Sequence, residues 1–152
     1  MSQLFNLQGK TAVVIGGTSG IGKALSLGLA DAGADVVASA RRQQNVDETA
    51  AEIEQRGHNT LRLTSDMGDR GSLEALLYAS VKSFGKVDIL INCAGKIKRT
   101  PTLTMPEDEW NSIVDTNLTG TLRACQVRVG VRLILPAQLM RMSTLPKDLT
   151  EA

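Results

Sequence analysis

Apolar residues along this chain come in short runs, and between the runs they recur with the spacing of a helix. Stretches of helical spacing predict a helix from the glycine-rich segment to about residue 30, and further helices over 46–53 and 73–84. Gly57 and Gly85 are expected to end the last two, and the capping box Thr104–Glu107 predicts another helix starting near Pro106. Strands alternating with helices predict an α/β fold with a doubly wound parallel sheet. The predicted strands are Thr11–Gly16, Ala34–Ala40, Leu61–Thr64 and Val87–Asn92.

Residues 127–152 break this pattern. Apolar residues alternate with period two over Val127–Leu135, then Pro136 and a short helical pattern around Gln138–Met142 follow. A helix continuing into this region would show a 3.6-residue period instead. We therefore divide the chain into a nucleotide-binding region, 1–126, and an atypical tail, 127–152, with the sheet truncated after about its fourth strand. That strand would be an open edge, and the alternating tail is a candidate to pair with it.

Composition excludes several function classes. The net charge is +1 and only four residues are aromatic, so no basic, base-stacking surface for nucleic acid is expected. No run approaches the roughly 18 apolar residues of a membrane span, and the N-terminus does not resemble a signal peptide. One histidine, His58, and two cysteines give neither a metal site nor a disulfide framework. We expect a cytoplasmic protein without a metal, a membrane partner or a nucleic-acid partner.

The strongest chemical signal is the segment GGTSGIG, directly after the first predicted strand and directly before a helix. Gly16 would allow the tight turn, Gly20 would let a pyrophosphate approach the backbone, and Gly22 would let the helix pack closely. The free amides and positive dipole end of the helix would then face the phosphates. The predicted contacts to a dinucleotide are Gly16, Gly17, Thr18, Ser19, Gly20, Ile21 and Gly22.

The G-x-x-x-G-x-G spacing of this loop resembles that of the short-chain dehydrogenase/reductase family, and further landmarks follow in the family's order. Asp66-Met67 follows the third predicted strand, and Asn92–Gly95 resembles the N-N-A-G motif with Cys93 in place of the second Asn. Asn117 matches the Asn of the helix after strand four. The resemblance covers about residues 4–126, although Ile15 stands where many members have Thr.

The resemblance implies a Rossmann-like fold and an oxidoreductase that transfers hydride between a nicotinamide cofactor and a carbonyl or alcohol substrate. It implies that Asn117 takes part in catalysis. Further cofactor contacts implied by it are Asp66, Met67, Asn92, Ala94 and Gly95.

The residues at the end of the second strand favour NADP over NAD. An NAD-binding protein usually carries an acidic residue there, about 20 residues after the glycine loop, for the ribose 2′-hydroxyl. Here Ala40 occupies the position and is followed by Arg41 and Arg42. Arginine can bind a 2′-phosphate through two parallel hydrogen bonds, and Ser39 would add a hydroxyl.

The family's remaining catalytic groups have no counterpart after Asn117. In the family a Tyr acts as general acid and base, a Lys four residues later lowers its pKa, and a Ser orients the substrate. The single tyrosine, Tyr78, does precede Lys82 by four residues, but both lie before Asn92 on a helix face predicted to meet solvent. The sequence favours a truncated chain that is inactive alone, with a non-catalytic NADP-binding module or a poorly folded fragment as alternatives. The family's usual homo-oligomer is not expected, because helices of the C-terminal half help to build it.

Overall fold

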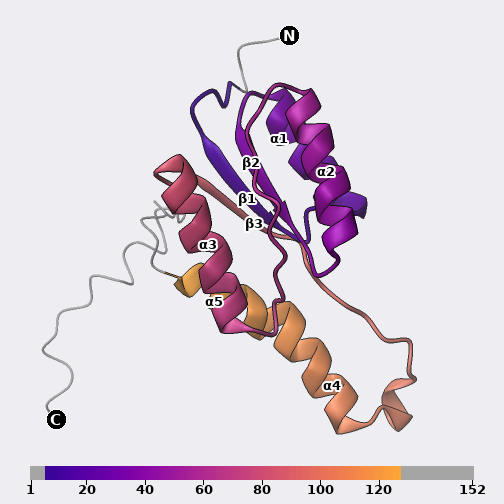
Figure 1. Ribbon diagram of the computed structural model, residues 1–152. Helices are drawn as coiled ribbons and strands as arrows, with labels where there is room; N and C mark the ends of the chain where they lie inside the picture. The colour runs from indigo at the N-terminus through magenta and orange to yellow at the C-terminus, as the bar shows by residue number, and fades with distance from the viewer. Residues whose placement is uncertain (1–5, 128–152) are drawn as a thin grey trace, which may run out of the picture.

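The computed structural model describes residues 6–127, which fold around a parallel sheet of three strands in the order β2-β1-β3 (Figure 1). The strands are β1 (Thr11–Ile15), β2 (Asp35–Ser39) and β3 (Ile89–Asn92). Val13 of β1 lies opposite Val37 on one side and Leu90 on the other. The predicted α/β architecture with a parallel sheet is confirmed, and so are three of the four predicted strands.

Helices cover both faces of the sheet (Figure 1). Helices α1 (Gly20–Asp31) and α2 (Gln43–Gln55) pack on one face, and α3 (Arg70–Phe84) and α5 (Gly120–Gln126) pack on the other. Helix α4 (Glu107–Val114) extends past the sheet and continues into α5 through a π-helical stretch, Asp115–Thr119. No helix within residues 6–127 is long and apolar enough to cross a membrane.

The central strand explains why the runs of apolar residues are continuous. Val13 and Ile15 join the core under α3 and α5, whereas Ala12 and Val14 join the core under α1 and α2. All four side chains are fully buried or nearly so. Successive side chains of a strand point to opposite faces, so a strand covered on both faces must be apolar at every position.

The prediction of a strand at Leu61–Thr64 is wrong. The segment runs beside β2, but its backbone bonds to that strand are isolated: Val36 N–H donates to Asn59 O (3.1 Å) and Ser65 N–H to Ala40 O (3.1 Å). Between them the carbonyl of Leu63 accepts a hydrogen bond from the Ser39 side chain (2.6 Å). In a regular ladder the Leu63 carbonyl would accept from a backbone N–H. Here it accepts from the Ser39 hydroxyl instead, which interrupts the ladder.

The helix predicted near Pro106 is present, but the capping box is not formed. Helix α4 begins at Glu107 without a side-chain cap, because Thr104 ends a 3-10 turn (Thr102–Thr104) and its hydroxyl donates to Pro101 O (3.3 Å). The predicted end of the helix over 73–84 is confirmed. Gly85 ends α3 in the left-handed conformation, with φ of 78°.

Among the described residues the sheet has two edge strands, β2 and β3, and all four residues of β3 are only half-buried. Within this range β3 pairs with β1 alone, so the fourth predicted strand lies at an edge, as expected. The predicted pairing of the tail with this edge, and the helix around Gln138–Met142, lie outside the described residues.

The carboxylate of Asp88, just before β3, connects β1 and β3 at the amino ends of the strands. Asp88 accepts a hydrogen bond from the Thr11 N–H (2.9 Å), and its oxygens lie 3.2 Å from Lys86 Nζ and 3.5 Å from Lys10 Nζ. Desolvation opposes ionisation, but the Thr11 hydrogen bond and the two ammonium groups outweigh it. The net result is a pKa of Asp88 below its ordinary value.

Candidate functional site

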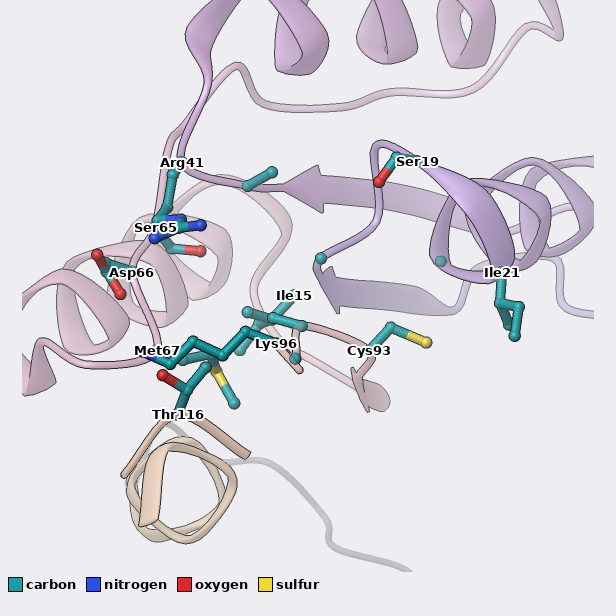
Figure 2. A pocket seen from close by; sticks show the side chains of 15 residues that line it. Ile15, Ser19, Ile21, Arg41, Ser65, Asp66, Met67, Cys93, Lys96 and Thr116 are labelled. Carbon is teal, nitrogen blue, oxygen red and sulfur yellow. The ribbon is translucent and has the colours of Figure 1, made fainter. Parts of the chain in front are cut away.

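A cleft of about 370 Å³ opens where the carboxyl ends of β1, β2 and β3 meet (Figure 2). Ligands of open α/β sheets bind at this edge, where the strand order reverses on either side of the first strand. The loops after all three strands, the start of α1, the segment before α3 and one residue of the π-helical stretch line it. The lining residues are Ile15, Gly16, Ser19, Ile21, Gly22, Ala40, Arg41, Ser65, Asp66, Met67, Cys93, Ala94, Gly95, Lys96 and Thr116.

The glycine-rich loop is packed so tightly that side chains are excluded at three of its positions. A Cβ on Gly17 would lie 2.7 Å from Val14 O. A Cβ on Gly16, which has φ of 81°, would lie 2.4 Å from Ala94 N, and one on Gly22 would lie 2.0 Å from Gly16 O. Gly20 differs, because a Cβ there would meet no atom within 4 Å. The loop is therefore closed against the sheet, while Gly20 is open to solvent at the start of the helix.

The start of α1 carries unused hydrogen-bond donors. Ser19 stands at the N-cap with extended backbone, but its side chain makes no capping hydrogen bond. The first amide groups of any helix lack an intrahelical acceptor, and the helix dipole makes this end positive. Since Ser19, Ile21 and Gly22 also line the cleft, an anionic group in the cleft would face these donors.

The loop after β3 is fastened to the loop after β1. The amides of Cys93 and Ala94 both donate to the carbonyl of Ile15, at 2.8 and 2.9 Å. Figure 2 shows Cys93 near the side of the cleft formed by the glycine loop, while Met67, Lys96 and Thr116 lie together at another side. These hydrogen bonds hold the segments after β1 and β3 together on one side of the cleft.

Arg41, Ser65 and Asp66 group together at the end of the cleft beyond β2 (Figure 2). Arg41 is exposed, and among residues 6–127 its guanidinium takes part in no ion pair. Ser39 was expected to add a hydroxyl here, and this is wrong. Its side chain is fully buried and donates to Leu63 O, with its oxygen 2.8 Å from the Ser65 hydroxyl.

The side chain of Asn117 is fully engaged by backbone. The Asn117 amide donates to Lys96 O (2.9 Å) and accepts from Lys96 N–H (2.9 Å). It thus makes the two hydrogen bonds with Lys96 that a backbone residue of a neighbouring strand could make. The contact fixes the loop after β3 against the π-helical stretch. The geometry makes Asn117 a positioning residue for this loop, and its catalytic role stays a prediction.

Several residues predicted to bind cofactor do not line the cleft. Gly17 and Thr18 are buried within the loop, and Gly20 is exposed at the start of α1. Arg42 is exposed at the N-cap of α2. Asn92 lies at the end of β3 with its amide 3.5 Å from Cys125 Sγ. Tyr78 is 55% exposed on α3 and is not among the lining residues, as the solvent-facing prediction required. The predicted set that does line the cleft is Gly16, Ser19, Ile21, Gly22, Arg41, Asp66, Met67, Ala94 and Gly95.

Sequence reasoning missed two polar residues that line the cleft, namely Ser65 and Thr116. Each is a direct neighbour of a predicted residue: Ser65 precedes Asp66, and Thr116 precedes Asn117. Extending both motifs by one residue would have included them. Lys96 also lines the cleft, and it begins the stretch Lys96–Thr100 that the family resemblance places at the border of the substrate side.

Comparison with known proteins identifies the family. The model described as short chain dehydrogenase matches residues 10–130. A 2-dehydro-3-deoxy-D-gluconate 5-dehydrogenase of Dickeya dadantii is 39% identical over 114 residues, which are 75% of this chain and 44% of that protein.

Solved structures agree with this match. A short-chain type dehydrogenase/reductase from Mycobacterium marinum has a TM-score of 0.78 at 35% identity, covering 84% of this chain and 52% of that one. A hydroxysteroid dehydrogenase from Escherichia coli has a TM-score of 0.77 at 31% identity, covering 81% and 52%. The chain spans about half the length of the relatives it matches.

Proposed function

Since the chain belongs to the short-chain dehydrogenase family, we propose that its cleft binds NADP and serves hydride transfer between that cofactor and a carbonyl or alcohol substrate. The single observation that carries the proposal is the glycine loop. It is closed to side chains at Gly16 and Gly22, open at Gly20, and set at the start of α1 beside a cleft of about 370 Å³. A pyrophosphate is the chemical group that such a loop accommodates.

The dinucleotide fits the residues of the cleft. Its pyrophosphate would lie against the amides at the start of α1, and its adenine end would meet Asp66 and Met67. The 2′-phosphate would lie at Arg41, an exposed guanidinium free of ion pairs among residues 6–127. When bound, the cofactor supplies the hydride.

The preference for NADP rests on charge. At the end of β2, Ala40 occupies the position at which an acidic side chain would repel a 2′-phosphate. Arg41, the next residue, lines the cleft. A hydrogen bond between ionised partners contributes about 1.5–3 kcal/mol. Loss of the Arg41 side chain should therefore weaken NADPH binding roughly 10–100-fold and leave NADH binding little changed.

The test is a titration of the purified chain with NADPH and NADH, followed by nucleotide fluorescence and thermal midpoint. NADPH at about 100 times its dissociation constant should stabilise the fold by roughly 2.7 kcal/mol. We expect Arg41→Ala to abolish the preference for NADPH, Arg42→Ala to reduce it less, and Lys82→Ala on α3 to leave it unchanged. Equal affinity of the parent chain for NADPH and NADH would refute the preference, and absence of binding would refute the nucleotide site.

A further inference from the structure

A second hollow of about 280 Å³ adjoins the nucleotide cleft, and Lys96 lines both. It lies between the loop after β3 and helix α4. The two hollows also meet along the helix, because Ser112 of this one and Thr116 of the cleft are one turn apart, joined by a hydrogen bond from Thr116 Oγ1 to Ser112 O (3.1 Å). Its lining consists of Lys96, Lys98, Asp108, Glu109, Ser112 and Ile113.

Two ammonium groups in this hollow have no acidic partner within ion-pair distance. Among residues 6–127, neither Lys96 nor Lys98 forms an ion pair. Lys96 is half-buried, and its ammonium donates to the neutral hydroxyl of Ser112. A partly desolvated cation with a neutral partner gains most from an anionic ligand, because charge-assisted hydrogen bonds are the strong ones.

The same hollow also offers acceptors. Glu109 accepts a hydrogen bond from Thr100 Oγ1 (2.6 Å), so one of its oxygens is engaged by the protein. Asp108 makes no ion pair and no side-chain hydrogen bond with residues of the described range, and its carboxylate can accept only. A ligand that fits must therefore bring hydroxyl donors as well as a negative charge.

The loop that carries the lysines is held in place. Asn117 fixes the backbone of Lys96 on both sides, and a Cβ on the preceding Gly95 would lie 3.3 Å from the Asn117 side-chain oxygen. Gly95 and Lys96 both line the nucleotide cleft. A ligand at the lysines would therefore lie directly beside a bound dinucleotide.

We propose that this hollow binds a hydroxylated carboxylic acid, which, resting on the function proposed above, is the substrate class of the reaction. Lys96 and Lys98 hold its carboxylate, and Asp108 accepts hydrogen bonds from its hydroxyl groups. A wholly apolar ketone would offer no anionic partner to the two lysines and no donor to Asp108.

The test uses the chain saturated with NADP⁺ and isothermal titration with sodium D-gluconate as the probe. Sorbitol has the hydroxyl groups without the carboxylate, and propionate has the carboxylate without hydroxyl groups. At fixed ionic strength we expect gluconate to bind at least tenfold more tightly than either. Lys98→Gln should weaken gluconate binding about tenfold without changing NADPH affinity, and the matched change Lys82→Gln on α3 should alter neither.

Equal binding of gluconate and sorbitol would overturn the role of the carboxylate, and equal binding of gluconate and propionate would overturn that of the hydroxyl groups. Unchanged gluconate affinity in Lys98→Gln would overturn the assignment to the lysines. NADPH binding without gluconate binding overturns this inference and leaves the nucleotide site standing. Gluconate binding without NADPH binding supports the hollow and overturns the proposed function, and binding of neither overturns both.

Discussion

Replacing Gly22 by alanine should damage both the fold and the nucleotide site. The new Cβ would lie 2.0 Å from Gly16 O and 2.9 Å from Gly16 C, whereas ordinary contacts between such atoms are about 3.4 Å or more. The loop would have to move by more than about 1 Å relative to α1, and the blocking atoms are backbone, which cannot rotate away. Overpacking of this kind destabilises by about 1–3 kcal/mol or more, so we expect about 3 kcal/mol.

Helix α1 supplies its own control. Gly28 lies in the same helix, and a Cβ there would meet no atom within 4 Å. Gly28→Ala should therefore stabilise the chain by about 0.5–1 kcal/mol through helix propensity. The two alanine variants should differ by about 4 kcal/mol, although the chemical change is the same.

The assay is urea and thermal unfolding, each followed by circular dichroism, paired with NADPH titration. For a chain of this size, about 3 kcal/mol corresponds to a midpoint temperature lower by roughly 10 °C. Gly22→Ala should also lose NADPH affinity, because its loop no longer closes against the sheet, while Gly28→Ala should keep it. A Gly22→Ala chain as stable as Gly28→Ala would refute the packing argument, and full NADPH affinity in it would refute the link between loop closure and binding.

Two further predictions concern other contacts. Gly120→Ala would place a Cβ 2.7 Å from Met67 O, so we expect about 2 kcal/mol of destabilisation, while Gly71→Ala, with its nearest atom at 3.4 Å, should change stability by less than about 1 kcal/mol in the same urea assay. Similar losses in both would contradict the contact. Asp88→Asn should lower stability at pH 7 by about 1 kcal/mol, since it removes a charged acceptor of the Thr11 N–H. Because the folded pKa of Asp88 is depressed, its contribution is present above about pH 4 and is lost as the pH falls, so the two chains should converge towards about pH 2. A difference that persists unchanged at pH 2 would show that the carboxylate charge is not its source.

The sequence by itself determined the first two strands of the sheet and the position of the glycine loop between strand and helix. Strands were predicted over Thr11–Gly16 and Ala34–Ala40, and the structure forms them over Thr11–Ile15 and Asp35–Ser39. They were predictable because a strand covered on both faces is a nearly continuous apolar run, and this pattern is local. The glycine loop was equally readable, since its spacing and its place between strand and helix are properties of neighbouring residues. The end of α3 followed from Gly85 for the same reason.

Only the tertiary structure decided which partners those residues meet. Leu61–Thr64 has a strand's composition, but the Ser39 hydroxyl takes a carbonyl of that segment and no ladder forms. The same contact removed Ser39 from the cleft. Both polar atoms of the Asn117 side chain bond to the backbone of Lys96, 21 residues away, which no local pattern predicts, and the catalytic role of Asn117 stays a prediction.

The physical reason is that sequence patterns report burial and local backbone preference, whereas hydrogen-bond partners are set by packing between distant segments. Lys96 illustrates this most clearly. It directly follows the motif Asn92–Gly95, but only the fold places it between the nucleotide cleft and the hollow beside α4. Which donors and acceptors surround a ligand is decided where the ends of three strands and one helix meet, and no single stretch of the chain contains that information.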